Sequence, residues 1–157
     1  MQIELLCIGK TDQGWLKEGI DVYAKRLRHY VPFELTECHP PGKWKGLPPE
    51  QLKEKEGEVI LSRMKKACIS VLLDEKGKSF RSLAFAGFLE SLMNRSPKTV
   101  LFVIGGAWGF SEEVYNKADH LLSLSPMTFS HQIIRLIFAE QCYRAMTILR
   151  NEAYHNE

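Results

Sequence analysis

Five short stretches of the chain carry the apolar pattern of β-strands. Four are nearly continuous hydrophobic runs, and one alternates between apolar and polar residues. Continuous runs of this length are typical of strands buried on both faces of a sheet, and alternation is typical of a half-buried strand. We therefore predict strands over residues 2–9, 33–38, 69–74, 99–104 and 120–124.

The segments between these strands repeat apolar residues every three or four positions, as amphipathic helices do. We predict a helix capped by Asp12 that runs to about Tyr30, and a second helix over 50–67. A third helix is capped by Ser82 and runs to about Asn94. A short helix capped by Ser111 follows, and the last helix runs from about Ser130 to Asn151. Residues 39–49, rich in proline, are expected to form a loop, and residues 75–80 a turn.

Strands and helices alternate along the whole chain, and no repeat or linker divides it. This pattern predicts a single α/β domain, residues 1–157, with a mainly parallel sheet and helices on both faces. A chain of 157 residues is long enough to bury one hydrophobic core.

Composition limits the class of protein further. Hydrophobic residues make up 45% and charged residues 25% of the chain, which excludes wholesale disorder. No window reaches the ~18 apolar residues of a membrane span, and the N-terminus lacks the basic segment of a signal peptide. We expect a cytoplasmic protein.

The cysteines and histidines show no metal-ligand spacing. Cys7, Cys38, Cys68 and Cys142 are widely separated, and three of them lie in apolar patterns, which favours buried, reduced thiols. We expect no bound metal ion.

The net charge of +2 is too small to indicate a nucleic-acid partner by itself. Many lysines and arginines fall within residues 10–66, where they form either a basic face or a solvated helix surface balanced by the glutamates of 50–58. The loop 39–46 places an aromatic residue between two lysines, which suits a nucleic-acid contact but also an ordinary exposed loop.

Three predicted strands end in loops that are candidates for a ligand site, because ligands of parallel α/β sheets bind beyond the carboxyl ends of the strands. These loops follow Leu73, Ile104 and Leu124. The glycine-rich turn over 105–110 lets a ligand approach the backbone closely, although a tight structural turn would explain it equally well. Neither this turn nor the segment 77–79 has the glycine spacing of a dinucleotide-binding motif or a P-loop.

On the last helix, Glu140, Arg144, Thr147 and Asn151 share one narrow stripe opposite an apolar face. Glu140 precedes Arg144 by four residues, the favourable order for an ion pair. The pair is either a surface salt bridge or part of a polar stripe that lines a site or a symmetric subunit contact, and its apolar surroundings favour the second interpretation. The Tyr154-His155 pair after this helix is either a frayed tail or an element that stacks on a base.

Six segments in this order resemble the SPOUT-class RNA methyltransferases. They are IELLCIGK with the following Trp15, LLDEKGK, FVIGGAWGF, LSLSPMTFSHQ, the pattern R-x-x-x-x-E-Q-x-Y-R-A from Arg135, and the final Tyr-His. Within this class, the chain is most similar to the small single-domain family that methylates N3 of a pseudouridine in bacterial 23S ribosomal RNA.

The resemblance implies a trefoil knot near the C-terminus, a homodimer, and S-adenosylmethionine held at the knot. It implies that the donor is bound by Leu73, Gly105, Leu124, Ser125, Pro126, Met127, Thr128 and Phe129. On the side of the target base it places His131, Glu140, Arg144, Tyr154 and His155.

Methylation of an imide nitrogen requires loss of its proton, and His131, Glu140 and His155 are alternative general bases. Arg144 is a candidate to stabilise the imide anion. Basic residues would hold RNA phosphates, with the dimer and a ribosomal particle supplying further surface. Two other readings remain: a non-catalytic RNA- or ribosome-binding factor with the same core, and a small-molecule α/β enzyme that uses the turn 105–109 for a nucleotide.

Overall fold

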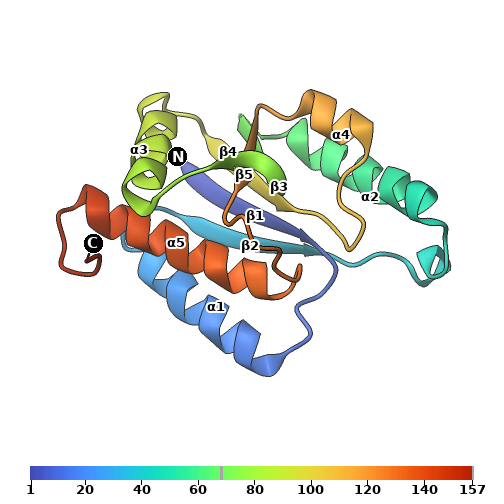
Figure 1. The fold of residues 1–157 in the computed structure, drawn as a ribbon, viewed down its shortest axis with the longest axis horizontal. Helices are drawn as coiled ribbons and strands as arrows, with labels where there is room; N and C mark the ends of the chain where they lie inside the picture. The colour runs from blue at the N-terminus through green and yellow to red at the C-terminus, as the bar shows by residue number, and fades with distance from the viewer. Residues whose placement is uncertain (68, 157) are drawn as a thin grey trace.

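The computed structural model describes residues 1–67 and 69–156. Its centre is a five-stranded sheet in the order β2-β1-β4-β3-β5, and every neighbouring pair is parallel (Figure 1). The strands are β1 Gln2–Ile8, β2 Phe33–Cys38, β3 Ile69–Ser79, β4 Thr99–Ile104 and β5 His120–Ser123. The predicted parallel α/β sheet is therefore confirmed.

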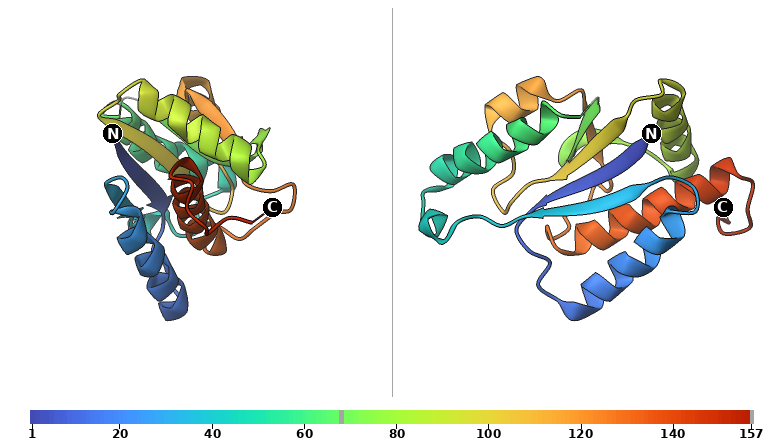
Figure 2. Two further views of the ribbon diagram at one scale, coloured as in Figure 1. Left: turned by 90° about the vertical axis from the view of Figure 1, so that its left-hand side faces the viewer. Right: turned by 180° about the vertical axis from the view of Figure 1, so that it is seen from behind.

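Helices cover both faces of the sheet, as the sequence predicts. One face is covered by α1 Gly14–Leu27, α3 Ser82–Asn94 and α5 Ile133–Leu149, and the other by α2 Pro49–Met64 and α4 Glu112–Lys117. Helix α5 packs between α1 and α3 (Figure 2). A short 3-10 helix, Gly42–Trp44, lies within the predicted loop.

Strand β1 shows why the runs read as continuously apolar. Leu5 and Cys7 pack toward α1, α3 and α5, whereas Leu6 and Ile8 pack toward α2 and α4, and all four are buried. Because successive side chains of a strand point to opposite faces, a sheet covered on both sides needs an apolar residue at nearly every position.

Two of the predicted helix caps are wrong. Helix α1 begins at Gly14 rather than after Asp12, and Arg81 rather than Ser82 precedes α3, without a side-chain cap in either case. Helix packing, not capping, therefore determines where these helices begin. Ser111 does cap α4, since its Oγ accepts a hydrogen bond from the backbone N–H of Val114 at 3.4 Å.

Strand β3 continues to Ser79, where the sequence predicted a strand that ends at Asp74 and a turn. The pairing with β5 is interrupted between Leu73 and Lys78, both of which lie opposite Leu122. The irregular residues 74–77 remain at the carboxyl end of the sheet, and Gly77 passes directly against β5.

Cys7 and Cys142 are buried free thiols, and burial raises the pKa of Cys7 to about 12. Cys38 is a free thiol but only half-buried, and Cys68 lies outside the described residues. In the described part of the chain, none of the helices is long and apolar enough to cross a bilayer.

The basic residues of 10–66 do not form one continuous face. Those on α1 and those on α2 lie on opposite sides of the sheet. On α2, Lys53 pairs with Glu50 and Lys55 pairs with Glu58. The alternative of a solvated, balanced helix surface therefore describes α2 better.

Candidate functional site

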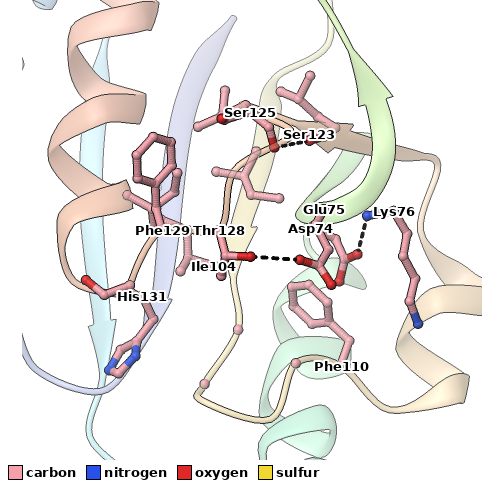
Figure 3. Close-up of a pocket in the computed structure, with 18 of the residues that line it drawn as sticks. Asp74, Glu75, Lys76, Ile104, Phe110, Ser123, Ser125, Thr128, Phe129 and His131 are labelled. Atoms are coloured by element: carbon pink, nitrogen blue, oxygen red, sulfur yellow. Dashed lines mark hydrogen bonds between the residues drawn. The ribbon is translucent and has the colours of Figure 1, made fainter.

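A cavity of about 530 Å³ opens at the carboxyl ends of β3, β4 and β5 (Figure 3). The three loops that the sequence singled out meet here because parallel strands end at the same edge of a sheet. The wall is formed by residues 73–76, 104–110, 122–125 and 127–131, with Tyr115 and Ile134.

Most residues expected to bind a donor lie in this wall. They are Leu73, Gly105, Leu124, Ser125, Met127, Thr128 and Phe129, whereas Pro126 is not among the lining residues. His131 also lines the cavity, and it is the one residue expected on the target-base side that does so among the described residues.

The segment after β5 is shaped by its own serines. Ser123 Oγ donates to the carbonyl oxygen of Ser125 at 2.9 Å, and Ser125 Oγ accepts from the backbone N–H of Met127 at 2.9 Å. Met127 is 75% exposed and Trp108, in the glycine-rich turn, is 59% exposed. The mouth of the cavity therefore presents large apolar side chains to solvent, as a surface that contacts a base or another chain would.

The glycine-rich turn closes through a hydrogen bond from the N–H of Gly109 to the carbonyl oxygen of Gly106 at 3.1 Å. Gly109 has a φ of +79°, which favours glycine. A Cβ on Gly106 would lie 2.5 Å from a carboxylate oxygen of Glu56, so any larger residue here would displace this buried side chain.

Glu56 is a neighbour of the site that the sequence analysis missed. It is 6% exposed, lies behind the glycine-rich turn, and has its pKa raised by burial. The sequence does carry a signal for the burial of Glu56. This residue lies four residues after Leu52 and four before Ile60, so it falls on the apolar stripe of α2.

Arg135 has a role that the sequence pattern does not predict. Its side chain is fully buried. It donates to the carbonyl oxygens of Ile8, Gly9 and His131 at 3.0, 3.0 and 2.9 Å, and to Thr11 Oγ1 at 2.9 Å. Arg135 thereby ties the last residue of the cavity loop to the end of β1.

A carboxylate completes this network. Glu37 Oε1 accepts from the N–H of Thr11 at 2.7 Å and lies 3.5 Å from Arg135 Nη1. Burial alone would raise the pKa of Glu37, but hydrogen bonding from Thr11 and the charge of Arg135 outweigh it and lower the pKa.

The other residues expected at the target base form a second cluster. Glu140 Oε1 accepts from Arg144 Nη2 at 2.6 Å and from Tyr154 OH at 3.1 Å, and Arg144 Nη1 lies 3.3 Å from His155 Nδ1. The hydrogen bond from Arg144 to Glu140 raises the pKa of Arg144, and burial with bonding to Tyr23 and Glu140 raises the pKa of Tyr154. Tyr154-His155 is therefore an ordered element, not a frayed tail.

This second cluster does not line the cavity. Arg144 follows Ile134, which lines the cavity, by ten positions, and this is about 15 Å along the axis of α5. The predicted polar stripe also includes Thr147, but this residue is buried and donates to the carbonyl oxygen of Arg144 at 2.7 Å. The structure thus divides the predicted site into two separate groups.

Comparison with known proteins agrees with this architecture. Residues 1–155 match the family described as predicted SPOUT methyltransferases. A protein named ribosomal RNA large subunit methyltransferase H from Parabacteroides distasonis is 54% identical over 157 residues, which is all of both chains. The protein of the same name from Christiangramia forsetii is 52% identical and covers 99% of each chain.

Solved structures show the same fold at low identity. A probable methylase family protein from Haemophilus influenzae has a TM-score of 0.56 at 13% identity, with 99% of this chain and 70% of that chain covered. A probable methyltransferase from Bordetella pertussis has a TM-score of 0.56 at 11% identity, with 92% and 96% covered. With the full-length sequence match, these findings establish that the chain belongs to the SPOUT methyltransferase family, together with the ribosomal RNA large subunit methyltransferases H.

Proposed function

We propose that this protein transfers a methyl group from S-adenosylmethionine to N3 of a pseudouridine in 23S ribosomal RNA, and that it acts on ribosomal particles in the cytoplasm. The observation that carries the proposal is the cavity at the ends of β3, β4 and β5, in a chain of this family. The relatives' name supports ribosomal RNA of the large subunit as the substrate class.

The cavity suits a nucleoside-linked amino acid. Its volume of about 530 Å³ falls in the usual range for small-ligand sites. Leu73, Ile104 and Leu124 offer apolar surface for an adenine ring, and the backbones of Gly105 and of the loop 124–129 offer hydrogen-bonding groups for its edge and the ribose. When bound, the donor supplies an electrophilic methyl group, and the protein contributes chiefly by placing the reacting atoms in line.

His131 is the general base that we favour for the imide proton. Glu140 already accepts hydrogen bonds from Arg144 and Tyr154, whereas His131 lines the cavity itself. A base must lie within hydrogen-bond reach of the proton that it removes. Arg144 provides positive charge for the imide anion.

One protomer cannot bring both groups to the same base, because Arg144 lies about 15 Å along α5 from the cavity. We therefore propose a homodimer in which the cluster of Glu140, Arg144, Tyr154 and His155 from one protomer faces the cavity of its partner. The half-buried ion pair of Glu140 and Arg144 on α5 suits such a symmetric contact.

We also propose that the C-terminal part of the chain forms a trefoil knot, as the family resemblance implies. The segment after β5 lines the same cavity as the loops after β3 and β4, and α5 then packs between α1 and α3. Both features support a threaded chain at this edge of the sheet.

The test is methyl transfer from labelled S-adenosylmethionine to ribosomes that lack the modification, followed by mapping of the labelled nucleotide. We expect label at N3 of a single pseudouridine of 23S RNA. Donor binding without transfer to any ribosomal particle would contradict this substrate. Absence of donor binding would reject the proposal entirely and favour a non-catalytic ribosome-binding factor.

A further inference from the structure

Two carboxylates project into the cavity from the irregular part of β3, and they differ in their bonding (Figure 3). Asp74 accepts a hydrogen bond from Tyr115 OH at 2.5 Å and another from the backbone N–H of Lys76 at 2.8 Å. Among the residues that the structure describes, Glu75 accepts a hydrogen bond only from Thr128 Oγ1, at 3.3 Å. Both carboxylate oxygens of Asp74 therefore accept hydrogen bonds from the protein, whereas most acceptor positions of the Glu75 carboxylate have no partner among the described residues.

Glu75 forms no ion pair with a described basic side chain, although Lys76 also lines the cavity. Lys76 Nζ lies 5.5 Å from the ring centroid of Tyr115. The hydrogen bond to Thr128 crosses the cavity and holds the carboxylate between the irregular part of β3 and the loop after β5. A carboxylate without an ion-pair partner among the described residues thus lies at the cavity wall.

The donor and its product differ in charge. S-adenosylmethionine carries a sulfonium and an ammonium group against one carboxylate, so it is a net cation. As the imide nitrogen forms its bond to the methyl carbon, the carbon–sulfur bond breaks and its electron pair stays on sulfur, so S-adenosylhomocysteine has a neutral thioether and no net charge. A site that binds both equally well retains its product, whereas an uncompensated carboxylate favours the cation.

We propose that Glu75 is a specificity-determining residue, which favours the cationic donor over its neutral product. This inference depends on the donor pocket of the proposed function. Because Glu75 is exposed, water screens its charge, and the expected contribution is about fivefold in the ratio of the two affinities.

Two variants separate the charge from the hydrogen bond. Glu75→Gln removes the charge but keeps the size of the side chain and a group that bonds Thr128. Thr128→Val removes that hydrogen bond and keeps the charge. Calorimetry measures the dissociation constants of S-adenosylmethionine and S-adenosylhomocysteine for each protein, at low and at high salt.

For Glu75→Gln we expect donor binding to be about fivefold weaker than in wild type, while product binding stays within twofold of wild type. The preference for S-adenosylmethionine over S-adenosylhomocysteine therefore decreases. For Thr128→Val we expect both constants to change by the same factor. High salt should reduce the preference in wild type but not in Glu75→Gln.

Equal weakening of both ligands in Glu75→Gln, or no change in either, would overturn the role of Glu75 while leaving the donor pocket intact. A wild-type protein that binds neither ligand would overturn the pocket and this inference together.

Discussion

Arg135 Nη2 lies 3.0 Å from the carbonyl oxygen of Ile8, so the first turn of the last helix is bonded to the end of the first strand. These residues are 127 positions apart in the sequence. The guanidinium also bonds the carbonyl oxygen of His131, and it therefore positions the residue that we favour as the general base.

Replacing Arg135 with Met should destabilise the fold by roughly 3 kcal/mol, because it leaves three carbonyl oxygens and Glu37 without their buried partner. Urea unfolding measures this change. Arg150→Met makes the same substitution at an exposed position and should change the free energy of unfolding by less than about 0.5 kcal/mol. Equal losses of unfolding free energy in the two variants would show that the Arg135 network stabilises the fold no more than an exposed arginine does.

Arg144→Ala should abolish most methyl transfer, by on the order of 100-fold, while donor binding stays at the wild-type level. The reason is that Arg144 is near the proposed target base but does not line the cavity. Labelled methyl transfer and calorimetry measure the two properties separately. If both are lost together, Arg144 serves folding or dimerisation instead.

Gly77→Ala should destabilise the protein by roughly 3 kcal/mol, because the new Cβ would lie 2.5 Å from the backbone nitrogen of Leu122. Gly87 is the matched control. A Cβ there meets no atom within 4 Å and the residue is exposed on α3, so alanine should stabilise the fold by up to about 1 kcal/mol. Thermal unfolding of both variants compares them, and an unaffected Gly77→Ala protein would contradict the close passage of β3 against β5.

The effect of Glu56→Gln should depend on pH. Burial raises the pKa of Glu56, so the folded state holds its proton more tightly than the unfolded state does. Ionised Glu56 therefore destabilises the fold above its folded pKa, and this cost disappears as pH falls below the ordinary value near 4.5.

We expect the urea midpoint of Glu56→Gln to exceed that of wild type at pH 7 and to approach it near pH 4. Glu54→Gln, on the exposed side of the same helix, should show a small difference that does not vary with pH. A constant or opposite difference for Glu56→Gln would mean that the carboxylate is stabilised where it lies.

The sequence predicted the strands well because both faces of this sheet are covered, and burial on both faces leaves a continuous apolar run such as Val100 to Ile104. It failed at the start of α1 and α3, where packing overrides the capping preference of Asp12 and Ser82. The sequence also predicted an end of β3 that is too early. Gly77 and its polar neighbours have the composition of a turn, although they belong to the strand.

The site was predictable only in part. The three loops had to meet because parallel strands share a carboxyl edge, so local pattern was enough to find them. The contacts of Arg135 with Ile8 and of Glu56 with Gly106 join residues far apart in the chain, and no local pattern specifies such pairs. The distance between Arg144 and the cavity likewise depends on how α5 lies across the sheet.

The most direct measurement is a crystal structure of the protein with S-adenosylmethionine bound. We expect the adenosine between Leu73, Gly105 and Leu124, and His155 of a second protomer facing the methyl group. A donor bound elsewhere, or a cavity from which the second protomer is turned away, would contradict the proposed site.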